Sequence, residues 1–173
     1  MNPNAPSFDS NWFRAALGQF ATGVTVVTAR DRDQHDEARL AGLTATSFNS
    51  LSLDPPLILW SLDNRAGSLP LFEASSHYAI NVLSSEQVEL ARRFSSRTIF
   101  GSQRFDGLTW GEGLGGAPLL PGCCAWFECS NLSRHQAGDH LIFIGQVERC
   151  AFESREPLLF QAGGFKTVSD LSG

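Results

Sequence analysis

The sequence contains a single lysine, Lys166, among its 13 basic residues, and its 18 acidic residues give a net charge of −5 at pH 7. A Schiff-base mechanism therefore has one candidate, which lies near the end of the sequence with no sign of a buried site around it. The acidic balance argues against nucleic acid as a partner, because binding to phosphates needs a basic face.

Metal-binding and redox spacings are also missing. No two cysteines form a C-x-x-C pair, and no two histidines form an H-x-x-x-H pair. We therefore predict no metal site. The cysteines lie in apolar, strand-like sequence, which is typical of buried thiols in a reducing compartment; they are Cys123, Cys124, Cys129 and Cys150.

We also expect neither a membrane-spanning segment nor a leader. The first ten residues contain neither the basic n-region nor the apolar h-region of a signal peptide. The longest apolar runs fall far short of the ~20 residues that span a bilayer. We expect a cytoplasmic protein with no membrane partner.

The composition that remains is that of a globular domain. Of the 173 residues, 42% are hydrophobic and 18% are charged, which is typical of a folded chain and not of a disordered one. A chain of this length buries about 70% of its unfolded surface, so one core is sufficient. We predict a single domain over residues 1–173 with its core at about 11–168.

Residues 111–116 read G-x-G-x-x-G, the pattern of a dinucleotide-binding turn. Such a motif must follow a strand and open a helix, so that the helix N-terminus faces the pyrophosphate. Pro118 and Pro121 follow too closely for a long helix. We interpret these glycines as turn residues within a long excursion over 97–121, which is functional or a subunit contact.

Strands dominate the expected secondary structure. A short helix capped by Asn11 carries Phe13, Leu17 and Phe20 on one face, and a capping box at Ser84 and Gln87 opens a second helix. The segment 31–37 is predicted as a charged hairpin tip. Many strands with turn punctuation favour an antiparallel barrel; the expected strands are 24–27, 38–48, 57–62, 77–83, 123–131, 141–150 and 158–160.

Residues 42–62 form the most informative segment. The first half is small and rich in hydroxyls, and the second half is an apolar strand entered through Asp54-Pro55-Pro56. Small side chains let a flat ligand approach the backbone, and hydroxyls and amides can hydrogen-bond a ring that carries many acceptors. By composition alone, residues 44–47 fit an ordinary strand with exposed hydroxyls better than a ligand site.

This segment resembles the isoalloxazine-binding strand of the short-chain flavin reductases, which supply reduced flavin to two-component monooxygenases. Residues 13–28, 137–147 and 157–165 resemble the opening helix and strand, the Gly-Asp-His strand and the closing strand of the same family, in the same order. The resemblance implies a mainly β fold, an antiparallel split β-barrel with short peripheral helices. It also implies a homodimer with the flavin near the subunit boundary.

By this resemblance, FAD or FMN contacts the strand at 44–47, the strand end after Ser61 and an aromatic residue. The implied residues are Thr44, Ala45, Thr46, Ser47, Ser61, Leu62, Asp63, Asn64, Ser68 and Phe94. We expect the side chains of Ala45 and Thr46 to face the ligand and not the core. Thr46 stands where relatives often carry Asn, and Phe94-Ser95-Ser96 lacks the glycine of the family's aromatic turn.

The segment 61–68 is a strand end that opens into small polar residues, which suits an anion. Asn64 could equally cap the helix that follows. By the resemblance, the flavin phosphate and ribityl chain lie here, with Arg65 as a charge partner.

His140 follows Gly138-Asp139 at the start of a strand. A lone histidine is most often structural, but the resemblance places it, with Phe165, where NADH stacks on the flavin. Its role there is to orient the nicotinamide or a phosphate. Gly163-Gly164-Phe165 lacks the basic residue of the family motif, and Lys166 points to the opposite face of a strand.

Together these residues predict an NAD(P)H:flavin oxidoreductase that transfers a hydride from NADH to FAD or FMN and supplies a partner monooxygenase. Proximity of the two rings is the main catalytic effect, so no residue is predicted as nucleophile or general base. The lack of a clustered basic patch for a 2′-phosphate favours NADH. Two alternatives stay open: an electron carrier whose FMN never leaves, and a reductase of another acceptor such as a corrinoid or a ferric complex.

Overall fold

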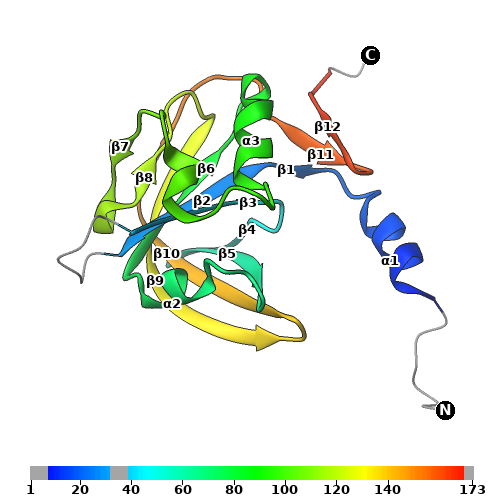
Figure 1. The fold of residues 1–173 in the computed structure, drawn as a ribbon, viewed down its shortest axis with the longest axis horizontal. Coiled ribbons are helices and arrows are strands. Elements are labelled where there is room, and N and C mark those ends of the chain that lie inside the picture. Colours follow the sequence, from blue (N-terminus) through cyan, green and yellow to red (C-terminus); the bar gives the residue numbers. More distant parts are fainter. Residues whose placement is uncertain (1–7, 32–38, 170–173) are drawn as a thin grey trace.

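A seven-stranded antiparallel sheet forms the centre of the molecule (Figure 1) in the computed structural model, which describes residues 8–31 and 39–169. Its strand order is β3-β2-β6-β9-β10-β5-β4. In chain order the strands are β2 (Thr25–Asp31), β3 (Arg39–Ala45), β4 (Asn49–Leu53), β5 (Pro56–Asp63), β6 (His77–Val82), β9 (Ala125–Ala137) and β10 (His140–Phe152).

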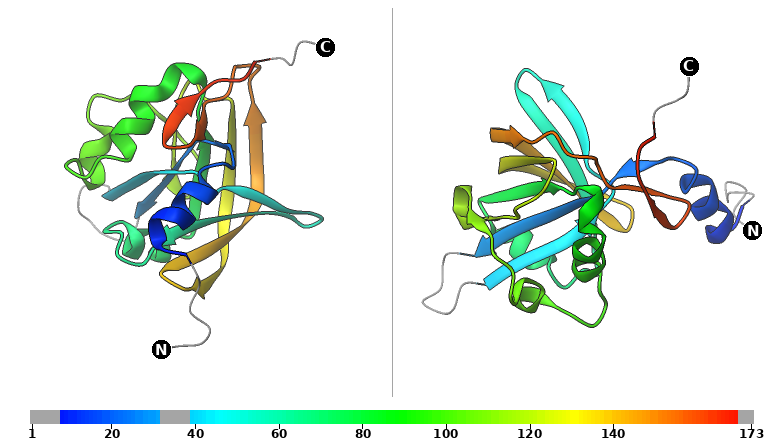
Figure 2. Two further views of the ribbon diagram at one scale, coloured as in Figure 1. Left: turned by 90° about the vertical axis from the view of Figure 1, so that its right-hand side faces the viewer. Right: turned by 90° about the horizontal axis from the view of Figure 1, so that it is seen from above.

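The sheet rolls into an open barrel (Figure 2). Its two edge strands are consecutive in the chain: β3 ends at Ala45 and β4 begins at Asn49. Because an extended chain covers at most ~3.6 Å per residue, the linked ends of β3 and β4 lie within roughly 14 Å of each other. Residues 46–48 therefore mark the place where the two edges of the sheet approach each other.

Smaller elements surround the barrel. A three-stranded sheet contains β1 (Thr22–Gly23), β11 (Leu159–Gln161) and β12 (Gly164–Lys166), and β7 (Gly111–Glu112) pairs with β8 (Pro118–Leu119). In the part of the chain that the structure describes, the 3₁₀ turns are η1 (Ser85–Gln87), η2 (Gly101–Phe105) and η3 (Leu114–Gly116). Gly115 and Gly116 have φ of 64° and 78°, so the G-x-G-x-x-G segment is a turn, as predicted, and opens no long helix.

The described residues contain three short α-helices: α1 (Ser10–Leu17), α2 (Leu69–Ala74) and α3 (Val88–Phe94). The prediction that Asn11 caps the first helix is wrong. The carboxylate of Asp9 accepts hydrogen bonds from the backbone amides of Asn11 and Trp12 at 2.9 and 2.8 Å, and therefore caps it. The predicted capping box at Ser84 and Gln87 is confirmed; it opens η1, which continues into α3.

Several strand boundaries differ from prediction. The strand expected over 38–48 ends at Ala45, because the chain turns there to enter the other edge of the sheet. The last long strands, β9 and β10, are each 13 residues long and pair as one extended hairpin. The predicted hairpin tip at 31–37 lies, apart from Asp31, outside the described residues.

Two clusters of buried side chains form the core. Inside the barrel, Trp60 stacks on Phe143 at 4.5 Å between ring centroids and meets Phe72 and Tyr78 edge-on. The second cluster lies under α3, where Phe94 packs edge-on against Phe105. Burial of each large side chain contributes about 1.5–3 kcal/mol, so these aromatic contacts determine how the strands pack.

The apolar face predicted for the first helix is not buried in this chain. None of the residues of α1 is buried; Trp12 is 71% exposed and Phe20, which follows the helix, is 75% exposed. The helix lies at the side of the barrel, next to β11 and β12 (Figure 1). Among the described residues, no helix combines the length and apolar character needed to cross a membrane.

The cysteines only partly match prediction. All four thiols are free, and Cys123 and Cys129 are buried. Burial raises the pKa of each of these two thiols to about 12, which makes them poor nucleophiles. Cys150, which we expected to be buried, is exposed because the end of β10 extends beyond the barrel core.

Candidate functional site

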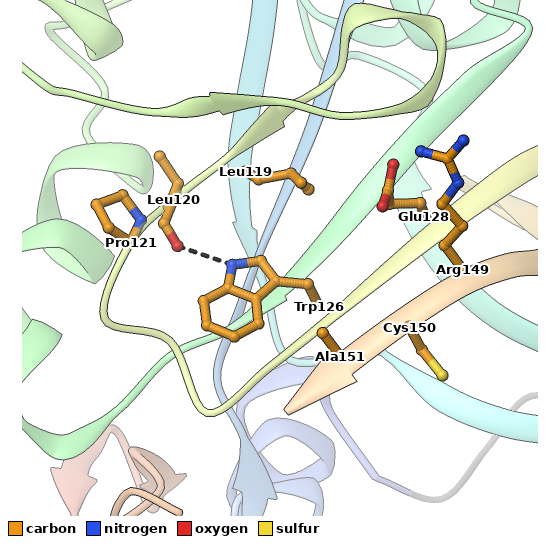
Figure 3. Close-up of a pocket in the computed structure, with 8 residues that line it drawn as sticks. All are labelled: Leu119, Leu120, Pro121, Trp126, Glu128, Arg149, Cys150 and Ala151. Carbon is orange, nitrogen blue, oxygen red and sulfur yellow. Dashed lines mark hydrogen bonds between the residues drawn. The ribbon is translucent and has the colours of Figure 1, made fainter. Parts of the chain in front are cut away.

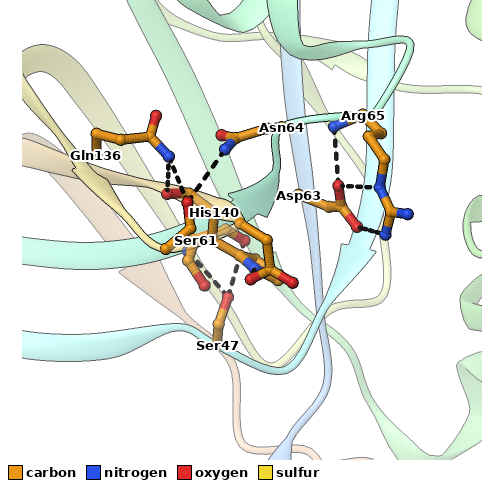
Figure 4. A network of polar contacts seen from close by, with 9 residues as sticks. Ser47, Ser61, Asp63, Asn64, Arg65, Gln136 and His140 are labelled. Carbon is orange, nitrogen blue, oxygen red and sulfur yellow. Dashed lines mark hydrogen bonds and ion pairs between the residues drawn. The ribbon is translucent and has the colours of Figure 1, made fainter. Parts of the chain in front are cut away.

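The turn at residues 46–48 is fastened to the end of β5 (Figure 4). The hydroxyl of Ser47 accepts a hydrogen bond from the backbone amide of Ser61 at 3.0 Å and donates to the Ser61 carbonyl oxygen at 3.2 Å. Thr46, beside it, is exposed. The small hydroxyl residues therefore line a fixed, accessible turn between the two edges of the sheet.

The end of β5 lies beside the start of β10. Asp63 is paired in register with His140, and the backbone amide of Asn64 donates to the carbonyl oxygen of Asp139 at 3.0 Å. Ser61 and Asp63 are half-buried on the outer face of β5, whereas Leu62 between them is directed into the core. Alternation along both strands thus places Ser61, Asp63 and His140 on one face.

Arg65 is held by Asp63. The carboxylate of Asp63 accepts hydrogen bonds from Nε and Nη2 of Arg65 at 3.1 and 2.9 Å, and from the backbone amide of Arg65 at 2.8 Å. These bonds hold the pKa of Asp63 well below its usual range and raise the pKa of Arg65. Both groups are therefore charged at neutral pH, and the side chain of Arg65 is 85% exposed.

His140 is oriented by its neighbours on the hairpin. Its Nδ1 lies 2.7 Å from Oδ1 of Asp139, and this contact lowers the pKa of the Asp139 carboxyl. The side-chain amide of Gln136 donates to the carbonyl oxygens of Gly138 and His140 and so stiffens the turn. With Nδ1 engaged and the side chain 43% exposed, Nε2 is the ring nitrogen left for a ligand.

Two predicted contacts can involve only the backbone. Ala45 and Leu62 are each 7% exposed and belong to the cluster inside the barrel. The expectation that the side chain of Ala45 faces a ligand and not the core is therefore wrong, because Ala45 is the last residue of β3 and its side chain packs inward. Thr46, one position later, has an exposed side chain.

Phe94 is not brought to the surface with the others. Its side chain is 0% exposed and packs against Phe105 in the core under α3. Thr44 also faces α3, where its hydroxyl donates to the carbonyl oxygen of Ala91 at 2.7 Å. In the described structure the Phe94 ring therefore packs in the core and is not available to a ligand at the surface.

Phe165 lies apart from His140, on β12 of the three-stranded sheet. Its ring packs against Phe160, and the guanidinium carbon of Arg92 lies 6.0 Å from its centroid. Ser68, the last of the predicted residues, precedes α2 and makes no capping hydrogen bond. The residues that do come together are Ser47, Ser61, Asp63, Asn64, Arg65 and His140 (Figure 4).

Sequence reasoning gave no role to Asp139 or Gln136, which orient His140. Their signal is weak, because a turn residue and a polar strand residue look the same whether or not they support a neighbour. A separate cavity of about 600 Å³ (Figure 3) is lined by Trp126, Glu128 and Arg149, among others. It lies toward the far end of β10 from His140 and contains none of the predicted residues.

Comparison with known proteins decides the family. Residues 17–169 match the family model described as the flavin reductase like domain. The chain belongs to this family. It is 43% identical over 161 residues to the FMN reductase (NADH) SmoA of Agrobacterium fabrum, covering 93% of this chain and 87% of that protein. It is also 38% identical to HsaB of Rhodococcus jostii, the reductase subunit of a flavin-dependent monooxygenase, over 95% of this chain and 80% of HsaB.

A solved flavin reductase has the same fold. The structure of Streptomyces globisporus NADH:FAD oxidoreductase SgcE6 in complex with NAD and FAD fragments matches with a TM-score of 0.84 and 34% identity. The match covers 95% of this chain and 98% of that one. This confirms the fold predicted from the sequence, a mainly β antiparallel split barrel with short peripheral helices.

Proposed function

We propose that this chain is an NADH:flavin oxidoreductase that reduces FAD or FMN taken from solution and releases it to a separate oxygenase component. The observation that carries the proposal is the meeting of the 46–48 turn, the Asp63–Arg65 segment and His140 at one end of β5, in a member of the flavin reductase family. The names of SmoA, HsaB and SgcE6 support NADH as the donor and an oxygenase as the acceptor.

The donors of this region fit a flavin. A flavin ring carries several acceptors and its side chain ends in an anion; the exposed turn at Thr46 and Ser47 offers hydroxyls and amides for the ring. Asn64, Arg65 and Ser68 follow the strand end and offer an amide, a cation and a hydroxyl for the ribityl chain and phosphate. Bound flavin would supply the hydride-accepting chemistry, and the protein would supply position and charge.

His140 would orient the nicotinamide nucleotide. Asp139 fixes the ring through Nδ1, so Nε2 is directed away from the hairpin turn and can hydrogen-bond the amide or a phosphate of NADH. Phe165 would contribute a ring face from β12. Hydride transfer itself needs no general acid or base from the protein. The catalytic contribution of the chain is therefore to hold the two substrates together.

We also propose that the protein is a homodimer. The apolar side chains of α1 are exposed, and Leu53 on the β4–β5 hairpin and Phe152 at the end of β10 are 94% and 85% exposed. Monomers rarely expose so many large apolar groups, and a second copy would cover them. We further propose that residues 1–173 act as one domain in the cytoplasm, which agrees with four free thiols.

The test is anaerobic stopped-flow oxidation of NADH by flavin-free protein, with FMN, FAD and riboflavin added separately. The proposal predicts rapid bleaching of flavin absorbance with NADH and much slower bleaching with NADPH. Absence of NADH oxidation with all three flavins would contradict it. Reduction of a corrinoid or ferric complex without free flavin would favour a reductase of another acceptor.

A further inference from the structure

The guanidinium of Arg65 is already paired with an anionic group, the carboxylate of Asp63, and a flavin phosphate would be an anionic partner of the same kind. The carboxylate of Asp63 accepts hydrogen bonds at 3.1 and 2.9 Å from Nε and Nη2 of Arg65, which form one edge of the guanidinium. It also accepts the backbone amide of Arg65 at 2.8 Å, a donor that could otherwise point at an anion. A phosphate that approaches Arg65 therefore meets a cation whose best hydrogen-bonding edge is occupied.

The charges around Arg65 add to this effect. Asp139 lies close enough to act electrostatically on both Asp63 and Arg65, and it is 81% exposed. Two carboxylates, those of Asp63 and Asp139, meet one guanidinium here. The carboxylates outnumber the guanidinium, which opposes a ligand that is itself an anion.

We propose that Asp63 competes with the flavin phosphate for Arg65, and thereby keeps flavin affinity low enough for reduced flavin to leave the enzyme. This inference rests on the proposed function and on the phosphate lying beside Arg65. A carboxylate that neutralises the phosphate-binding cation limits how much the flavin phosphate adds to the binding affinity. It does not change the contacts to the flavin ring. The effect should follow the charge of that tail: largest for the monoester of FMN, smaller for FAD, and absent for riboflavin.

A different role for Asp63 would have the opposite sign. If the carboxylate served to orient Arg65 for phosphate binding, its removal would loosen the guanidinium and weaken affinity. The sign of the change in FMN affinity after Asp63→Asn therefore separates competition from orientation. The isosteric amide keeps the volume and can still accept the Arg65 backbone amide, so the fold is preserved.

The experiment measures the dissociation constants of FMN and riboflavin by fluorescence quenching at about 0.1 M ionic strength. For Asp63→Asn we expect FMN to bind about 5- to 30-fold more tightly, the range for one nearby charge at a partly exposed site. Riboflavin affinity should change less than about twofold, which is within the scatter of such measurements. The FMN dissociation rate in stopped flow should fall by a similar factor.

The chain offers a matched control in Glu153, which forms the same i, i+2 pair with Arg155 at 2.7 Å. That pair follows the end of β10, whereas His140 starts the strand. Glu153→Gln removes the same charge and should leave FMN affinity within about twofold of wild type, because the phosphate site is far beyond a Debye length of ~10 Å.

A second background distinguishes competition from simple repulsion. In Arg65→Ala protein, Asp63→Asn should give a clearly smaller gain in FMN affinity than in wild type, because no cation is released. An equal gain in both backgrounds overturns competition, as does weaker FMN binding by Asp63→Asn or an equal change for riboflavin. If wild-type protein failed to oxidise NADH, the proposed function would fall, while the FMN and riboflavin constants would still report on Asp63.

Discussion

The hydroxyl of Ser47 bridges both backbone polar groups of Ser61, at 3.0 Å from the amide and 3.2 Å from the carbonyl oxygen. Because Ser47 lies in the link between β3 and β4, this one side chain ties the turn between the sheet edges to β5. The geometry of the turn, and any ligand contact that the turn makes, therefore depends on a short side chain with two bonds.

Ser47→Ala removes both bonds and leaves the backbone of Ser61 unsatisfied at this point. We expect the free energy of unfolding to fall by about 1–3 kcal/mol, the usual effect of leaving a part-buried partner unpaired. Flavin affinity should weaken as the turn loosens. Urea denaturation and fluorescence quenching measure the two effects, and Ser50→Ala, at an exposed position on β4, is the matched control. Unchanged flavin affinity would separate the turn from the site.

Thr46→Arg tests the turn from the ligand side. The side chain of Thr46 is exposed, so the substitution should leave circular dichroism and the unfolding midpoint close to wild type. A long charged side chain should block the ring and weaken flavin binding at least about tenfold, or 1.4 kcal/mol. Unchanged affinity would remove the turn from the site. Ala45→Trp is unsuitable for this test, since Ala45 packs inside the barrel.

Much of the fold follows from local patterns. The apolar run at 57–62 identified β5, and the capping box at Ser84 and Gln87 gave the start of the segment that leads into α3. The end of β3 could not be predicted, because hydroxyl residues such as Thr46 and Ser47 fit a strand as well as a turn. Only the closure of the sheet, which depends on how strands from distant parts of the chain pair between β3 and β4, decides between them.

The site, like the fold, could be predicted from the sequence only in part. The resemblance pointed to residues on both β5 and β10, and the structure brings Ser61, Asp63 and His140 onto one face through strand register. It also carried over Phe94, whose ring is buried. A shared motif identifies which residue occupies a given position of the fold, but the direction of its side chain depends on the packing around it. The bidentate contact between Asp63 and Arg65 could not be read from spacing alone.

His140→Ala should raise KM for NADH or slow flavin reduction, with flavin affinity little changed. Loss of one hydrogen bond to the nucleotide corresponds to about 1–3 kcal/mol, or roughly five- to 150-fold in kcat/KM. Asp139→Asn should change kcat/KM in the same direction by less, because it only loosens the ring. His77→Ala, on β6, is the control. An equal loss of flavin binding by His140→Ala would reassign the residue to the flavin, and no effect would make it structural.

Gly145→Ala tests the packing of the barrel. A Cβ at Gly145 would collide with the hydroxyl of Tyr78 and lie 2.8 Å from its ring and 3.0 Å from Cβ of Cys129. Because Tyr78 is 1% exposed and cannot move aside, we expect a loss of at least about 1–3 kcal/mol in the free energy of unfolding. Gly23→Ala, where a Cβ meets nothing within 4 Å, should be nearly neutral. Equal denaturation midpoints for the two variants would contradict this packing.

We propose that flavin is a substrate that is reduced and released, and this is tested by following reduced flavin out of the protein. Flavin-free protein and NADH are placed on one side of a dialysis membrane under anaerobic conditions, and cytochrome c on the other. We expect added FMN or FAD to accelerate NADH oxidation to saturation, and cytochrome c to be reduced across the membrane. Protein that retains one flavin per chain through extensive dialysis, with no acceleration by free flavin and no reduction across the membrane, would contradict it and identify a bound electron carrier.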